Sequence, residues 1–150
     1  TASLFMSCVE MGAYAAGASD HEVKRIRQFA LLLGQAFQIK DDIFDYFIDT
    51  AVGKPTGNDL REGKITLPLI HALTSSHPKA AQMAELSRRD VLSTDEINQL
   101  IEFAKEAGGI EYAYATMERL RNESMQYLDM SNPVSKDFIK LFDYIIERTY

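Results

Sequence analysis

The chain has 150 residues, of which 46% are hydrophobic and 25% charged, with a formal net charge of −6 and a single cysteine. This length and composition suit one globular domain with a sizeable core, so we expect residues 1–150 to belong to a single domain. The acidic balance argues against a nucleic-acid-binding protein, and the lone cysteine excludes an internal disulfide framework. No apolar run reaches the length of a transmembrane helix.

Almost every segment shows the apolar spacing that is typical of an α-helix, and none shows the sustained alternation of a strand. The sequence therefore predicts an all-α protein. In chain order, the predicted helices cover about residues 2–16, 20–50, 66–75, 79–89, 94–107 and 110–130, followed by a last helix after Asn132 and Pro133.

Local signals mark several of the helix ends. Ser19 and Ser93 are each followed three residues later by a glutamate, which predicts a capping box at two helix starts. Residues 51–64 contain three glycines and a proline, so they predict a loop. Cys8 lies among apolar neighbours, and we expect it to be a buried packing residue.

A run of acidic residues interrupts the apolar part of the second predicted helix. At about 100° per residue, Asp41, Asp42 and Asp45 fall within about one quadrant, and Gln38 lies one turn earlier on the same stripe. The other faces are apolar except for Lys40, whose long stem is expected to snorkel toward solvent. The sequence thus predicts a largely buried helix that carries three carboxylates on one face.

Carboxylates stacked in this way repel one another, so a cation is expected beside them. Oxygen ligands without histidine or cysteine favour Mg²⁺, Mn²⁺ or Ca²⁺ over zinc or copper, and no EF-hand pattern is present. Magnesium commonly adds phosphate oxygens to one or two carboxylates. The loop that follows brings Lys54, Arg61 and Lys64 close in sequence, and such cations suit a diphosphate.

The alternative interpretation of such an acidic cluster is a solvated helix face. That alternative is disfavoured here because the acids interrupt hydrophobic sequence instead of lying opposite to it. The sequence therefore favours a metal and diphosphate site at this point of the chain.

At these residues the chain resembles the trans-isoprenyl diphosphate synthases, also called polyprenyl synthetases. The resemblance rests on Gly34, Phe37-Gln38, Asp41-Asp42-x-x-Asp45, Gly53-Lys54 and Gly57-x-Asp59-Leu60-x-Glu62-Gly63-Lys64-x-Thr66-Leu67-Pro68. It implies the C-terminal part of the isoprenoid synthase helical bundle. Family members carry two aspartate-rich motifs, and this sequence matches the second, so we expect a C-terminal portion of a single polyprenyl synthetase domain.

The resemblance implies a Mg²⁺-dependent prenyltransferase that condenses isopentenyl diphosphate head-to-tail with an allylic prenyl diphosphate. Asp41 matches a residue that binds a magnesium ion bridging to the diphosphate, and Asp42 and Asp45 complete the acidic stripe. Asp59 matches an acid that reaches magnesium through water. These four residues are the expected metal site.

Four further residues match family positions that contact the substrate. Lys54 and Lys64 match lysines that bind the allylic diphosphate. Thr1 and Gln38 match polar groups near the ionising carbon, where their oxygens stabilise the allylic cation. The resemblance assigns the base to no side chain, because the departing diphosphate is thought to accept the proton.

The resemblance also implies a cytoplasmic homodimer, and we expect these 150 residues alone to be inactive. The segments Glu62–Ile70 and Tyr144–Tyr150 look like those of medium and long-chain synthases that make quinone side chains, so a product longer than farnesyl is expected. Two alternatives stay open. A terpene cyclase would typically carry an Asn/Asp-Ser/Thr-Glu pattern as its second metal motif, and a non-catalytic subunit of a prenyl synthase would usually lose acids or lysines that this chain keeps.

Overall fold

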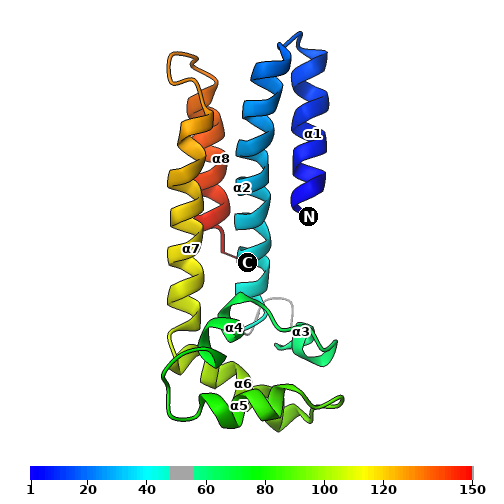
Figure 1. Cartoon of the computed structure of the whole chain (residues 1–150), viewed down its shortest axis with the longest axis vertical. Coiled ribbons are helices and arrows are strands. Elements are labelled where there is room, and N and C mark those ends of the chain that lie inside the picture. The colour runs from blue at the N-terminus through cyan, green and yellow to red at the C-terminus, as the bar shows by residue number, and fades with distance from the viewer. Residues whose placement is uncertain (48–55, 150) are drawn as a thin grey trace. The chain divides into compact units, whose positions relative to one another are not determined.

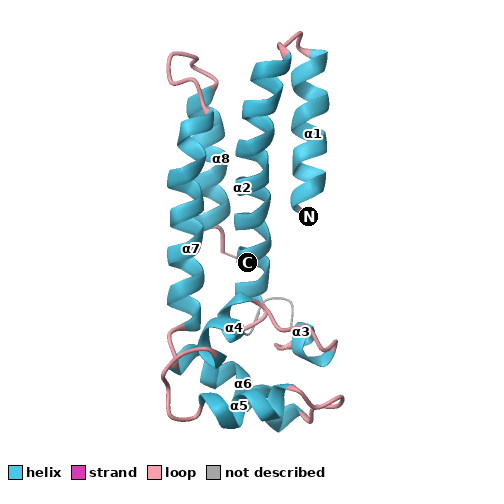
Figure 2. Ribbon diagram, in the orientation of Figure 1, coloured by secondary structure: helices cyan, strands magenta, loops and turns pink. Residues whose placement is uncertain are grey.

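The structure is a computed structural model that describes residues 1–47 and 56–149. Within these residues the chain forms α-helices and one short 3-10 helix, with no strand (Figure 2). The prediction of an all-α protein is confirmed. None of the described helices is long and apolar enough to cross a membrane. The chain divides into two compact units, residues 1–40 with 115–149 and residues 41–114, and each is described in turn.

The first unit is built from long helices. It holds the elements α1 (Ala2–Ala15), most of α2 (Asp20–Phe44), the end of α7 (Gly109–Ser124), η1 (Met125–Tyr127) and α8 (Ser135–Glu147) (Figure 1). Phe29 of α2 is fully buried, and its ring meets the rings of Phe138 and Phe142 edge-on, with centroids 5.4 and 5.9 Å apart. These aromatic contacts hold α8 against α2.

Helix α1 runs beside α2 at close range (Figure 1). A Cβ on Gly34 would come within 2.7 Å of the Cα of Ala2, so only glycine lets the two backbones approach this far. Helix α1 nevertheless has no buried residue, and Cys8 is exposed. The prediction of a buried Cys8 is wrong, because apolar neighbours in sequence do not decide whether another element covers that face.

Lys40 corrects a second expectation. Its side chain does not snorkel toward solvent but is 4% exposed, and its Nζ donates a hydrogen bond of 2.7 Å to the carbonyl of Ile146. That carbonyl lies in the last turn of α8, where helix carbonyls have no partner within the helix and the helix dipole is negative. The carbonyl at the end of α8 therefore compensates the buried ammonium group of Lys40 for the water that it loses.

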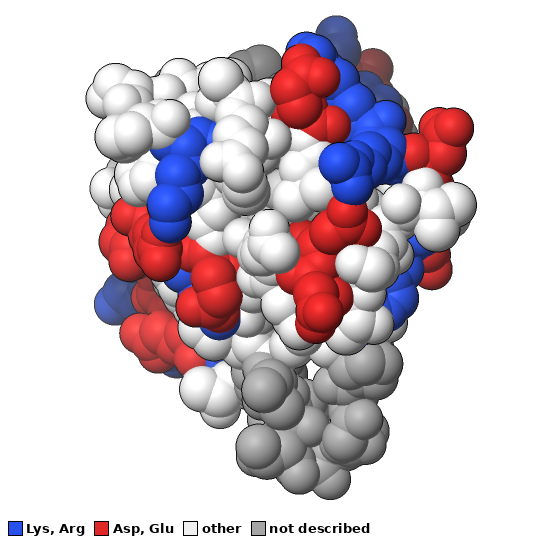
Figure 3. All heavy atoms as spheres, turned by 90° about the horizontal axis from the view of Figure 1, so that it is seen from below, with Lys and Arg blue, Asp and Glu red and all other residues white. Residues whose placement is uncertain are grey.

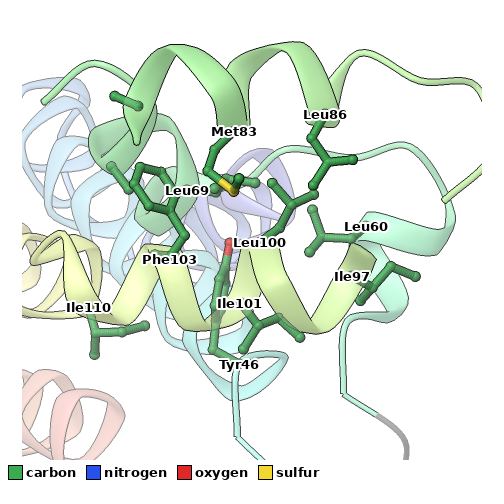
Figure 4. Close-up of a cluster of buried hydrophobic side chains, with 13 residues drawn as sticks. Tyr46, Leu60, Leu69, Met83, Leu86, Ile97, Leu100, Ile101, Phe103 and Ile110 are labelled. Atoms are coloured by element: carbon green, nitrogen blue, oxygen red, sulfur yellow. The ribbon is translucent and has the colours of Figure 1, made fainter. Parts of the chain in front are cut away.

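The second unit gathers short helices around one core. It contains the end of α2, then α3 (Asn58–Arg61), α4 (Leu67–Leu73), α5 (Ala80–Ser87), α6 (Thr94–Glu106) and the start of α7. Figure 4 shows the core side chains, with the ring of Tyr46 pointing into the cluster. Its members include Tyr46, Leu60, Leu69, Met83, Leu86, Ile97, Leu100, Ile101, Phe103 and Ile110.

Both predicted capping boxes are present. The amide of Ser93 donates to Glu96 Oε2 at 2.8 Å, and the amide of Glu96 donates back to Ser93 Oγ at 3.3 Å. Ser19 and Glu22 make the same reciprocal pair at 2.8 and 3.4 Å. The starts of α6 and α2 therefore follow from local side-chain chemistry.

Two predictions around the acidic run are wrong. Helix α2 ends at Phe44, not near residue 50, because the amides of Tyr46 and Phe47 bond to carbonyls three residues earlier and the chain turns. The predicted loop also contains a helix, α3, that the glycine and proline pattern did not indicate. Both differences bear directly on the candidate site.

The charged surface is mixed. On the face drawn in Figure 3, acidic and basic side chains are interspersed. Among the described residues, the pairs include Lys79, just before α5, with Glu106 of α6 at 3.5 Å and Arg88, just after α5, with Glu85 at 3.1 Å. These pairs are exposed, so they contribute little to stability.

Gly57 gives a test of the second unit's packing. It begins α3 at φ +73°, and a Cβ there would come 2.4 Å from Ile97 Cγ2, whereas Gly63 has φ +72° with open space around it. Gly63→Ala should cost about 1–2 kcal/mol for the left-handed conformation. Gly57→Ala should cost about 1–3 kcal/mol more because it overpacks the core. Thermal denaturation of both variants measures the difference, and equal losses would contradict the clash.

Candidate metal and diphosphate site

The acidic run lies where α2 ends. Asp41 and Asp42 are in the last turn of the helix, and Asp45 is the first residue beyond it. All three side chains are partly buried. The run therefore presents hard oxygen donors at a helix terminus instead of along a continuing helix face.

Asp45 has a structural role that the sequence did not reveal. Its Oδ1 accepts the amide of Asn58 and its Oδ2 accepts the amide of Asp59, each at 2.9 Å. Its backbone carbonyl accepts the amide of Gly57 at 2.9 Å. We call these three bonds the Asp45 clamp. A carboxylate on the free amides of the first turn is how helices are capped, so the clamp anchors α3 to the end of α2.

The clamp also brings Asp59 and Lys64 toward the acidic run. The amide of Lys64 donates to the carbonyl of Asp59 at 2.8 Å, which folds the chain back after α3. The Nζ of Lys64 lies 3.8 Å from Asp59 Oδ1 and 2.6 Å from Glu62 Oε2. The hydrogen bond and charge of Glu62 raise the pKa of Lys64, and Lys64 lowers the pKa of Glu62. Lys64 is therefore an exposed cation next to Asp59.

Tyr46 ties the same region to the segment after Lys64. Its ring is 3% exposed, and its hydroxyl lies 3.0 Å from Thr66 Oγ1. Burial raises the pKa of Tyr46 to about 12, so the phenol stays neutral at physiological pH and does not act as a base. Sequence reasoning missed Tyr46, because its hydroxyl partner, Thr66, lies 20 positions later in the chain.

Two other expected site residues meet in the first unit. The hydroxyl of Thr1 donates a hydrogen bond of 2.6 Å to Gln38 Oε1, although the two residues are 37 positions apart. Thr1 stands at the N-cap of α1, where its carbonyl accepts the amides of Leu4 and Phe5. Both Thr1 and Gln38 are exposed.

Of the expected site residues, Lys54 lies outside the described part of the chain. Among the residues that the structure does describe, no three histidine, cysteine or acidic side chains form a group that could hold a metal on their own. Both carboxylate oxygens of Asp45 already bind amides. The donor set around the end of α2 suits an ion such as Mg²⁺, which takes few carboxylates and completes its shell with water and phosphate.

Comparison with known proteins shows the family of the chain. A family model described as polyprenyl synthetase matches residues 1–104. Heptaprenyl diphosphate synthase component 2 of Geobacillus stearothermophilus is 38% identical over 130 residues, which is 86% of this chain and 40% of that protein. The chain thus spans less than half the length of this curated relative.

Solved structures share the fold. Geranylgeranyl pyrophosphate synthase from Bacteroides thetaiotaomicron is 41% identical with a TM-score of 0.85, covering 99% of this chain and 50% of that one. A polyprenyl synthase from Caulobacter crescentus, complexed with calcium and isoprenyl diphosphate, is 31% identical with a TM-score of 0.86, covering 100% of this chain and 47% of that one. These neighbours place the described helices in the isoprenoid synthase fold.

The raised pKa of Tyr46 predicts a pH dependence of stability. In the folded protein the phenol keeps its proton up to about pH 12, whereas the unfolded chain loses it near 10.0. Deprotonation therefore favours the unfolded state, and the free energy of unfolding should fall between these values by about 2–3 kcal/mol. Denaturant titrations at pH 9 to 12 should show a smaller fall in Tyr46→Phe. The exposed Tyr144 gives the control, since Tyr144→Phe should keep the full fall; equal curves for both variants would contradict the assignment.

Proposed function

Because the chain belongs to the polyprenyl synthetase family, we propose that it forms part of a Mg²⁺-dependent enzyme that condenses isopentenyl diphosphate with an allylic prenyl diphosphate. Two relatives support this proposal. One relative is called a heptaprenyl diphosphate synthase component, and one solved relative holds calcium and isoprenyl diphosphate. The working state in the proposal is a cytoplasmic homodimer, with residues 1–150 as one portion of a single synthetase domain.

In this proposal Asp41, Asp42 and Asp59 would hold the metal. Bound Mg²⁺ supplies the positive charge that neutralises a departing diphosphate. Asp45 shares the acidic motif, and its two carboxylate oxygens also hold the amides of Asn58 and Asp59. Its contribution is to keep Asp59 and Lys64 in place.

Lys64 and Lys54 bind the allylic diphosphate in the proposed mechanism. Lys64 is paired with Glu62 in this structure, and both are exposed, so a diphosphate can replace Glu62 as the partner of the ammonium group. A lysine ammonium group is protonated at physiological pH, so it attracts the diphosphate anion.

Thr1 and Gln38 stabilise the allylic cation. The hydroxyl hydrogen of Thr1 is committed to Gln38 Oε1, so the lone pairs of Thr1 Oγ1 remain for a neighbouring positive charge. Oriented oxygen dipoles of this kind lower the energy of a developing cation without reorganisation during the reaction. Neither side chain needs to accept a proton for this role.

The observation that carries the proposal is the Asp45 clamp. It joins the end of α2, with Asp41 and Asp42, to a helix and turn that supply Asp59 and Lys64. Acids and a lysine that are separated in sequence thus belong to one unit of the fold. This combination of oxygen donors and a cation is what a metal-diphosphate complex requires.

Substitution of the acids separates metal binding from structural support. In the full-length protein that contains this chain, Asp41→Asn should lower prenyl transfer by about 100-fold or more, comparable to the loss of other preorganised electrostatic groups, without lowering the melting temperature. Asp45→Asn should lower both activity and melting temperature, because an amide nitrogen then faces a backbone N–H. Transfer of labelled isopentenyl diphosphate and circular dichroism measure the two effects.

Asp90, an exposed acid between α5 and α6, supplies the matched control. Asp90→Asn should leave both activity and stability unchanged. Asp41→Asn with wild-type turnover at saturating Mg²⁺ would overturn the metal assignment. A wild-type protein that cyclises the allylic substrate instead of extending it would indicate a terpene cyclase.

The proposed product is a polyprenyl diphosphate longer than farnesyl. The similarity to a heptaprenyl and a geranylgeranyl synthase supports this length. When the full-length enzyme is incubated with farnesyl and isopentenyl diphosphates, the extracted products should exceed fifteen carbons, because an apolar tunnel admits the growing chain until a side chain blocks it. Sizing by chromatography checks this, and products that stop at fifteen carbons would contradict it.

A further inference from the structure

The end of α8 is attached to α2 by two cationic side chains. Lys40 Nζ donates to the carbonyl of Ile146 at 2.7 Å. One residue beyond α8, the guanidinium carbon of Arg148 lies 4.2 Å from the centroid of the Phe37 ring, and its Nη2 donates to the carbonyl of Phe37 at 3.4 Å. We call these contacts the C-terminal latch; all its residues belong to the first unit.

The latch holds one particular turn of α2. The two α2 residues that make these contacts are Phe37, directly before Gln38, and Lys40, two residues after it. On another side, the ring of Phe37 packs against Phe5 of α1, with centroids 5.3 Å apart at an angle of 48°. Phe37 is thus held between α1 and Arg148, and the residue that follows it carries the amide that binds Thr1.

These contacts differ in kind from ordinary surface ion pairs. The ammonium group of Lys40 is buried and charge-assisted, and a planar guanidinium that both stacks and donates has a fixed orientation. A cation over an aromatic face gains more when it is partly desolvated. Such contacts limit rotation and sliding of the gripped turn, and the position of Gln38 Oε1 depends on that turn.

We propose that Arg148 is a positioning residue for prenyl transfer, acting through Phe37 to fix Gln38 against Thr1. The inference rests on the proposed function, in which Gln38 stabilises the allylic cation. It predicts that Arg148 affects the rate of the chemical step while diphosphate binding by the lysines is unaffected. Substitution of a residue that is needed only for folding would change stability without changing the rate of the chemical step.

The test uses steady-state kinetics of the full-length enzyme with an allylic diphosphate and isopentenyl diphosphate. Arg148→Ala should lower kcat by about 10- to 100-fold, the effect expected of a small misplacement at the reacting centre, and leave KM for the allylic substrate nearly unchanged. Arg148→Lys keeps the cation but loses the planar fork, so its kcat should fall less.

A matched control separates positioning from general support of α8. Arg121 on α7 also binds α8, through Asp143 at 2.8 Å, and its side chain is partly exposed. Arg121→Ala should lower the melting temperature yet keep the wild-type kcat at temperatures well below melting. Equal losses of kcat in the Arg121 and Arg148 variants would overturn the positioning role.

A double-mutant cycle gives the decisive readout. If Arg148 acts through Gln38, the double variant Arg148→Ala/Gln38→Ala should be no slower than Gln38→Ala alone, because the shared contribution is lost once. Effects that multiply would overturn the inference. If Arg148→Ala does not fold, Arg148→Lys takes its place in the cycle with the same criterion.

The wild-type rate distinguishes the two proposals. A wild-type enzyme that performs prenyl transfer, with Arg148 variants at the same kcat, overturns the role of Arg148 and leaves the proposed function standing. A wild-type enzyme without prenyl transfer overturns the proposed function, and the role of Arg148 falls with it.

Discussion

The arrangement of the second unit's functional side chains depends on one carboxylate. Asp45 takes two backbone amides that would otherwise be unsatisfied at the start of α3, and its own carbonyl takes a third. The short helix is far below the length at which a helix is stable alone, so this capping and the burial of Leu60 hold it in place. The Asp45 carboxylate therefore also determines where Asp59 and the turn to Lys64 lie.

Sequence reasoning succeeded where the controlling interaction is local. The two capping boxes join residues three positions apart, and the apolar spacing of the helices reflects which faces are buried, so both can be read from short windows. The acidic run and the lysine of the following turn can also be read from short windows, and their role in binding metal and diphosphate stays a prediction. The hydrogen bond between Thr1 and Gln38 could not be read from a short window, since 37 residues separate them; the family resemblance had only matched each to a polar group near the ionising carbon.

Sequence reasoning failed where the hydrogen-bond partner of a side chain lies far along the chain or is a backbone group. Helical periodicity continued α2 through Asp45 because no local signal shows that this side chain will bind amides 13 and 14 residues later. Lys40 looked like a residue that reaches for solvent, yet its partner is a carbonyl 106 positions away. The prediction that Cys8 is buried failed for a related reason. Hydrophobic neighbours in sequence do not show whether another element covers that face of the helix.

The absent side chain of Gly34 has a consequence for how accurately Thr1 meets Gln38. With Ala2 and Phe5 packed against the bare backbone of α2, the spacing of the two helices is set by hard contact between main chains. Backbone and Cβ atoms have no rotamers that could absorb a change in this spacing, so the distance between the two helices affects how the Thr1 hydroxyl meets Gln38. A methyl group added at Gly34 would push α1 away from α2. That displacement would change the distance between the Thr1 hydroxyl and Gln38.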